Sequence, residues 1–187
     1  IANDIKDIII GTGYKAKELT DHLTSSYPGI NFTFINNKKY RETNNIHSLA
    51  IIFSKIKFNE DILLIESDLI FDNQILKKII NSPFKNVALV DKYRTGLDGT
   101  VVKINEKNAI TEIIPPHLQD ENFSFNDKYK TLNIYTFSKE FCNSSFKKIL
   151  LYYSKVIDDN CYYELILGIL IYMQKDDIYA EIVDSEK

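Results

Sequence analysis

The sequence predicts an α/β fold with a mixed, mostly parallel central sheet flanked by helices. Two observations carry this prediction. Apolar segments of strand length alternate along the chain with segments whose apolar residues recur every three or four positions, which is typical of βαβ units. The run Ile62 to Ile65 is apolar at every position and continues without a turn into Glu66, Ser67 and Asp68. We therefore expect this run to be a central strand of a parallel sheet.

The first half of the chain is expected to alternate strands and helices. Its strands are expected at residues 5–10, 30–35, 62–66 and 87–90, and its helices at residues 15–23, 44–56 and 74–80. Thr43 or Asn44 is expected to cap the second helix, and the third is expected to begin near Asp72 and Asn73. The second helix is amphipathic because its apolar residues are spaced by three and four: Ile46, Leu49, Ala50, Phe53 and Ile56.

The second half alternates less regularly. Residues 100–104 and 110–114 are expected to form an antiparallel pair around residues 105–108, followed by a strand at 131–137. Helices are expected at residues 138–156 and 162–174, and the last strand at 178–183. The architecture is therefore a parallel βαβ half followed by a mixed half.

Composition argues against several classes of function. The 187 residues are 44% hydrophobic and 26% charged, as in an ordinary globular domain with its own core. A net charge of −3 argues against binding to nucleic acid or to an anionic membrane. The longest apolar stretch, residues 165–173, is too short to span a bilayer. Cys142 and Cys161 lack a CxxC partner and are expected to be free thiols, which favours a cytoplasmic protein.

Asp68 is a candidate metal ligand. In open α/β sheets, ligands bind outside the carboxyl ends of the strands, and Asp68 follows such a strand. A carboxylate is a hard oxygen ligand for Mg²⁺, which is usually held by one or two carboxylates plus substrate phosphates. The alternative is that Asp68 caps the following helix.

Two loops could contact a nucleotide. Gly11-Thr12-Gly13 follows a strand and precedes a helix, as phosphate-binding turns do, but it lacks the further glycine or lysine of the known fingerprints. A simple tight turn is therefore favoured. The loop from Tyr40 to Asn45 places Arg41, Glu42 and two carboxamides at the start of a helix. Carboxamides can read the edge of a base, and the alternative is a polar helix cap.

Three further features have ordinary explanations. His22, His47 and His117 form no convincing catalytic pair, and each is expected on the surface or on a helix. Tyrosines 152, 153, 162 and 163 are expected to pack in the core or to line an acceptor pocket. The polar segment 119–127 after Pro115 and Pro116 is a candidate lid.

Several segments, taken in order, resemble the nucleotidyltransferases of the 2-aminoethylphosphonate and phosphocholine cytidylyltransferase group. They are residues 9–15, 40–46, 66–68, 98–100 and 129–135. The narrower likeness to the 2-aminoethylphosphonate enzymes rests on Val90-Asp91-Lys92-Tyr93-Arg94 leading to Asp98-Gly99-Thr100. Together these segments cover nearly the whole chain.

The resemblance implies a Rossmann-like nucleotidyltransferase fold and Mg²⁺-dependent transfer of CMP from CTP to a small amine-bearing phosphonate or phosphate, with release of pyrophosphate. It implies that Asp68 binds the metal and that Lys130 acts in catalysis, facing an anionic oxygen of the acceptor. The residues implied to bind the nucleotide are Gly13, Tyr14, Thr43, Asn44, Asn45 and Ser67. Those implied to bind the acceptor are Arg41, Asp98, Asn133 and Glu164, with the Asp98 carboxylate suited to an ammonium group.

Two parts of the family pattern do not appear in this sequence. They are the glycine- and arginine-containing loop with its lysine before the first strand, and the acidic segment that completes the metal site after the last strand. We therefore expect a single nucleotidyltransferase-like domain over residues 1–187, incomplete at both ends and with little turnover by itself. The alternatives are a sugar-1-phosphate nucleotidyltransferase and an inactive nucleotide-binding domain of a longer protein. Fusion to or association with other enzymes of the same pathway is compatible with the resemblance, as is a homodimer.

Overall fold

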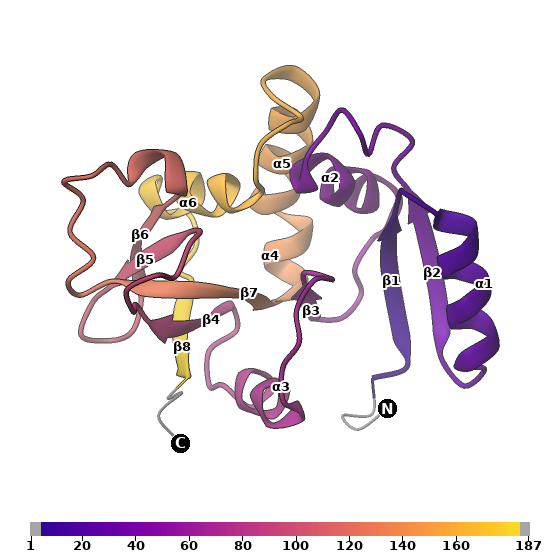
Figure 1. Ribbon diagram of the computed structural model, residues 1–187, viewed down its shortest axis with the longest axis horizontal. Coiled ribbons are helices and arrows are strands. Elements are labelled where there is room, and N and C mark those ends of the chain that lie inside the picture. Colours follow the sequence, from indigo (N-terminus) through magenta and orange to yellow (C-terminus); the bar gives the residue numbers. More distant parts are fainter. Residues whose placement is uncertain (1–4, 184–187) are drawn as a thin grey trace. The chain divides into compact units, whose positions relative to one another are not determined.

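The computed structural model describes residues 5–183, which divide into two compact units. The first unit contains residues 5–57 and 147–163, and the second contains residues 58–146 and 164–183. Both combine strands with helices (Figure 1). The predicted α/β class, with sheet strands flanked by helices, is confirmed.

The first unit is built on a parallel pair of strands. β1 (Asp7–Thr12) and β2 (Asn31–Asn36) pair in parallel, with Asp7 opposite Asn31 and Thr12 opposite Asn36. The connecting helix is α1 (Ala16–Ser26). The unit also contains α2 (Asn45–Lys55) and most of α5 (Ser145–Val156). The first βαβ prediction is confirmed up to this second strand, with bounds shifted by one to three residues.

Helix α2 follows its predicted pattern. Four of the five apolar residues predicted for its inner face are buried: Ile46, Leu49, Ala50 and Phe53. Asn44 is the N-cap, and its side-chain oxygen accepts a hydrogen bond from the Asn45 N–H at 2.8 Å. Asn44, and not Thr43, therefore caps the helix.

The second unit is built around β7 (Tyr129–Phe137). One edge of β7 pairs antiparallel with β4 (Val87–Lys92), which pairs in parallel with β8 (Tyr179–Val183). The other edge pairs antiparallel with two shorter strands, β5 (Val101–Ile104) and β3 (Ile62–Ile65). β6 (Ile110–Ile114) completes the predicted antiparallel hairpin with β5. The sheet is mixed, as predicted, but the expectation that it is mostly parallel was wrong. Among its described strands only β4 and β8 pair in parallel, and the other pairs are antiparallel because neighbouring strands such as β5 and β6 form hairpins.

The expectation for the run Ile62 to Ile65 was wrong. β3 pairs antiparallel with the second half of β7, and all four of its residues are only half-buried. An apolar run indicates that both faces of a strand are covered, but it carries no information on the direction of the neighbouring strand. Here the unusual length of β7 leaves room for β3 beside residues 134–137.

The helices of the second unit are α3 (Asn73–Ile80), α4 (Lys139–Asn143) and α6 (Glu164–Tyr172), with a short 3₁₀ turn at Pro116–Leu118. The single helix predicted for residues 138–156 is divided at Ser144 into α4 and α5. The Ser144 hydroxyl and N–H both donate to the Phe141 carbonyl, at 3.2 and 3.3 Å. This local bonding replaces the helical pattern and ends α4.

The core of the second unit lies between the sheet and its helices. On one side Leu76 and Ile79 of α3 pack with Val87, Leu89 and Ile134. Elsewhere the rings of Phe137, Phe141 and Phe146 contact one another, with centroids 4.9 to 5.6 Å apart. These contacts hold β4 and β7 against the helices of the second unit.

Two expectations from composition can be compared with the described residues. Cys142 and Cys161 are both free, and Cys142 is buried while Cys161 is half-buried. Within residues 5–183, no helix is long and apolar enough to cross a membrane.

Candidate functional site

The second unit brings together charged and polar side chains from three parts of its fold. Glu66 follows β3, Lys130 and Asn133 lie on β7, and Glu164 opens α6. The side-chain N–H of Asn133 donates to the Glu66 carboxylate at 3.1 Å, and the Glu66 backbone N–H donates to the Asn133 carbonyl at 3.2 Å. Glu66 and Glu164 also act electrostatically on Lys130. Of the residues predicted from the sequence, Lys130, Asn133 and Glu164 therefore belong to one polar cluster.

A bulge in β7 presents Asn133 to this cluster. Ala88 of β4 faces Tyr135, but Val90 faces Thr131, so one residue of β4 lies opposite three residues of β7. Asn133 has a φ of 57°, in the left-handed region that asparagine tolerates better than most residues. The Thr131 hydroxyl lies 3.2 Å from the Asn133 side-chain oxygen. The side chains of Glu66 and Thr131 thus both contact the Asn133 side chain and hold the bulge.

Lys130 lies close against a glycine. Its Nζ donates to the Thr131 carbonyl at 2.8 Å, and a Cβ on Gly99 would lie 2.9 Å from that Nζ. Gly99 also has a φ of 104°, which favours glycine. Burial lowers the pKa of Lys130, while the negative charges of Glu164, Glu66 and Asp98 act to raise it. The lysine is therefore partly desolvated beside three carboxylates.

Glu164 is the most buried carboxylate of the cluster. The residue is 5% exposed, and its Oε2 has no hydrogen-bond partner among residues 5–183. Burial raises its pKa to about 7; the charge of Glu66 also raises it, whereas a backbone hydrogen bond and Lys130 lower it. Three carboxylates around one ammonium group leave a surplus of negative charge when Glu164 is ionised. Such a cluster can bind a second cation.

Asp98 is exposed at the edge of the cluster. Its side chain accepts a hydrogen bond from the Gly99 N–H at 2.7 Å. The Gly99 carbonyl accepts a hydrogen bond from the side chain of Gln119 at 3.0 Å. Gln119 begins the segment 119–127, and the Tyr93 N–H donates to the Lys128 carbonyl just beyond its other end. The candidate lid is thus anchored at both ends, and its closure stays a prediction.

Ser67 and Asp68 are both exposed after β3. The Asp72 side chain caps α3 by accepting a hydrogen bond from the Gln74 N–H at 2.8 Å. This excludes the alternative in which Asp68 caps that helix. Residues 5–183 hold no group of three His, Cys, Asp or Glu that could bind a metal by itself. One exposed carboxylate fits Mg²⁺ that takes its remaining ligands from water and substrate phosphates.

In the first unit, Asn37 organises the loop that leads into α2. It is 2% exposed, and its side-chain N–H group lies 3.0 Å from both the Thr43 and the Ser48 hydroxyl oxygens. Its side-chain oxygen accepts from the Lys39 N–H at 2.9 Å. Asn37 was not identified from the sequence as a functional or structural residue. Its position directly after a parallel strand could have indicated such a role, because polar side chains at that end of a strand often lie near a site.

Thr43, Asn44 and Asn45 lie together in that loop, but their bonds are largely internal. The Asn45 side-chain oxygen accepts from the Tyr163 N–H at 3.0 Å, and the Asn44 N–H donates to the Asp159 carbonyl at 3.1 Å. The Asn44 side-chain oxygen accepts from the Asn45 N–H. The carbonyl ends of both asparagine side chains therefore bind backbone groups, as the polar-cap alternative requires.

Gly13, Tyr14 and Arg41 lie on the same unit near Tyr40. A Cβ on Gly13 would lie 2.6 Å from the Cβ of Tyr40, so only glycine fits there. The Tyr14 ring is exposed with its centroid 6.3 Å from that of Tyr40, and the Arg41 guanidinium lies 5.6 Å from the Tyr40 ring centre. Close packing, as in a tight turn, accounts for this glycine.

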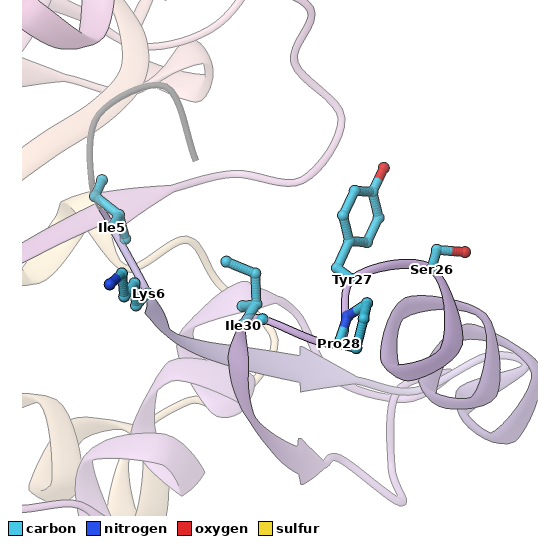
Figure 2. Close-up of a pocket in the computed structure, with 7 residues that line it drawn as sticks. Ile5, Lys6, Ser26, Tyr27, Pro28 and Ile30 are labelled. Atoms are coloured by element: carbon cyan, nitrogen blue, oxygen red, sulfur yellow. The ribbon is translucent and has the colours of Figure 1, made fainter.

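The three histidines and a pocket of the first unit are the remaining features to place. His47 on α2 has its Nδ1 3.3 Å from the Ser154 hydroxyl, while His22 and His117 are exposed. A pocket of about 340 Å³ is lined by Ile5, Lys6 and the turn at residues 26–30, whose side chains are drawn in Figure 2. This pocket is at the amino end of β1, whereas Gly13 follows the carboxyl end, so it contains none of the predicted site residues.

Comparison with known proteins tests the predicted family. A family described as a domain of unknown function (DUF6564) matches residues 1–93. The inositol-1-phosphate CTP transferase from T. maritima superposes with a TM-score of 0.72 and 16% identity, over 97% of this chain and 68% of that chain. This chain has the nucleotidyltransferase fold.

Two further comparisons agree with the nucleotidyltransferase fold. The CTP:phosphocholine cytidylyltransferase from Streptococcus pneumoniae has a TM-score of 0.67 and 16% identity, covering 100% of this chain and 73% of that chain. The CMP-5'-(3-aminopropyl)phosphonate synthase of Streptomyces rubellomurinus is 20% identical over 160 residues, or 86% of this chain. The chain spans 25% of the length of that relative. The resemblance is confirmed for the fold, and the narrower group within it stays a prediction.

Proposed function

We propose that this chain is a Mg²⁺-dependent cytidylyltransferase that transfers CMP from CTP to a small phosphonate or phosphate carrying an amine. The observation that carries the proposal is the surplus of negative charge around Lys130. Glu164, Glu66 and Asp98 all act on this single ammonium group. A sugar phosphate has no positive charge for such a cluster to bind, whereas an amine-bearing acceptor does.

In this proposal the two ends of the acceptor bind groups of opposite sign. The acceptor's ammonium group binds Glu164 and Asp98, and its phosphonate or phosphate oxygen binds Lys130. Charge-assisted hydrogen bonds of this kind are roughly twice as strong as neutral ones. The Oε2 of Glu164, which lacks a partner among the described residues, is the acceptor atom that an N–H of the ligand would satisfy.

The proposed reaction is an in-line displacement. An oxygen of the acceptor's anionic group attacks the α-phosphorus of CTP, the new P–O bond forms, and the bond to pyrophosphate breaks. Because that oxygen is already an anion, no general base is required, and positioning and charge supply most of the catalysis. Mg²⁺ bound by Asp68 and the phosphates would neutralise part of the phosphate charge.

Nucleotide recognition is proposed for Gly13, Tyr14, Thr43, Asn44 and Asn45, which all belong to the first unit. The names of two similar solved structures include CTP, and that of the curated relative includes CMP and an aminopropylphosphonate. These names support CTP as the nucleotide and an amine-bearing phosphonate as the acceptor.

Isothermal titration of two single variants tests the proposal. Asp98→Ala and Glu164→Gln should each weaken binding of 2-aminoethylphosphonate by about tenfold, because each removes a charged partner of the amine, and should leave the affinity for CTP with Mg²⁺ unchanged. Glu112→Gln is the matched control, since this exposed glutamate of β6 lies 3.6 Å from the Lys103 amine and outside the cluster. Equal weakening of CTP and acceptor binding would contradict the assignment.

A further inference from the structure

Glu66 was not among the predicted site residues, yet it makes the central contacts of the polar cluster. It binds Asn133 twice, through its carboxylate and through its backbone N–H, at 3.1 and 3.2 Å. Its charge also acts on both Glu164 and Lys130. Glu66 therefore connects the asparagine, the lysine and the buried carboxylate of the cluster.

We infer that Glu66 is a positioning residue of the acceptor site, whose carboxylate and backbone N–H hold Asn133 in the bulge of β7 and whose negative charge belongs to the same cluster as Glu164 and Lys130. The inference rests on the proposed function for the identity of the acceptor. It concerns a residue that touches the neighbours of the acceptor and need not touch the acceptor itself.

The first half of the inference concerns geometry. Asn133 occupies a left-handed conformation with φ of 57°, which asparagine tolerates but populates less readily than the right-handed and extended regions. The paired bonds to Glu66 fix both its backbone carbonyl and its side chain. Thr131, at 3.2 Å on the other side, carries the carbonyl that Lys130 binds. Glu66 therefore fixes the segment of β7 that carries the lysine.

The second half concerns charge. Burial is the largest cause of the raised pKa of Glu164, and Glu66 is the charged neighbour that raises it further. The positive charge of Lys130, on β7, lowers the pKa of Glu164. The negative charge of Asp98 in turn raises the pKa of Lys130. Helix α6 also packs on β6, where Gly168 meets Ile113, but Glu112 on that strand pairs with Lys103. Among the described residues, Glu66 and Lys130 are the charged neighbours that shift the pKa of Glu164.

Two substitutions separate geometry from charge. The amide oxygen introduced by Glu66→Gln can still accept the Asn133 hydrogen bond, but the negative charge is gone. Glu66→Ala removes both. In ligand-free protein, ¹³C NMR titration of the glutamate carboxyl groups follows Glu164 directly. Loss of the Glu66 charge should lower the titration midpoint of Glu164 in both variants. Glu112→Gln should leave it unchanged.

Acceptor binding supplies the readout for geometry. We expect Glu66→Gln to bind 2-aminoethylphosphonate only a few-fold more weakly than the wild type above pH 8, because one negative charge of the cluster is lost while the bulge is kept. Glu66→Ala should bind it about tenfold more weakly than Glu66→Gln at the same pH, because the bulge is no longer held. An unshifted Glu164 titration, or equal affinities of the alanine and wild-type proteins, would overturn the inference.

The two proposals fail in distinguishable ways. If wild-type protein binds no aminophosphonate at any pH, the proposed function fails, and the NMR titration still decides the effect of Glu66 on Glu164. If wild-type protein binds the ligand but both Glu66 variants behave as wild type in both measurements, the inference about Glu66 fails and the proposed function stands.

Discussion

The raised pKa of Glu164 predicts a specific pH dependence of folding stability. Burial raises that pKa from 4.5 to about 7 in the folded chain. Between these two values the folded state keeps a proton that the unfolded state has released, so the free energy of unfolding falls as the pH rises. A pKa difference of one between the folded and unfolded states corresponds to about 1.4 kcal/mol, so the wild-type protein should lose about 3 kcal/mol from this group between pH 4.5 and 7.

Glu164→Gln isolates this effect because the amide stays neutral at every pH. Urea unfolding of the wild-type and variant proteins should be measured at half-unit steps from pH 4.5 to 8.5. All other groups titrate in both proteins, so the difference between the two profiles belongs to Glu164 and to groups coupled to it. We expect the free energy of unfolding of the variant, relative to that of the wild type, to rise by about 3 kcal/mol between pH 4.5 and pH 7. Above pH 7.5 this difference should stay constant. Parallel profiles would refute the reasoning.

Three other substitutions test the local geometry through urea unfolding. Gly99→Ala should destabilise the chain by about 1 to 3 kcal/mol, because it adds a Cβ at positive φ against the Lys130 side chain; unchanged stability would contradict this packing. Asn133→Ala should cost about 1 kcal/mol more than Asn133→Gly, since glycine accepts the positive φ and both lose the Glu66 bond; equal costs would argue against backbone strain in the bulge. Asn37→Ala should cost about 2 to 3 kcal/mol through its lost buried hydrogen bonds, whereas a cost below about 0.5 kcal/mol would show that Asn37 does not hold the loop.

Local patterns along the chain predicted most of the helices and strands. The spacing of Ile46, Leu49, Ala50 and Phe53 predicted the buried face of α2, because a helix repeats over distances that a single sequence displays. The hairpin of β5 and β6 was predicted for the same reason, since its strands are separated by a short polar turn. These elements depend on neighbours in the sequence.

The pairing of β3 and the roles of Glu66 and Asn37 depend on residues far apart in the sequence. The direction of β3 is set by β7, more than sixty residues later, and no pattern within residues 62–65 reports it. Glu66 gains its role from Asn133, whose conformation depends on a register shift between β4 and β7. Resemblance to a family placed Lys130, Asn133 and Glu164 in one site, although their residue types alone did not.

The central claim is that the polar cluster binds the amine of a phosphonate or phosphate acceptor. Titration of the chain with 2-aminoethylphosphonate and with ethylphosphonate, at pH 8 and with Mg²⁺ and a CTP analogue that cannot transfer CMP, tests this claim most directly. The two ligands differ in the amine alone, and glucose 1-phosphate provides a sugar phosphate for comparison. We expect the amine to increase affinity by about tenfold to a hundredfold, the range for one or two charge-assisted hydrogen bonds. Equal affinities for the two phosphonates, or tighter binding of glucose 1-phosphate, would contradict the claim.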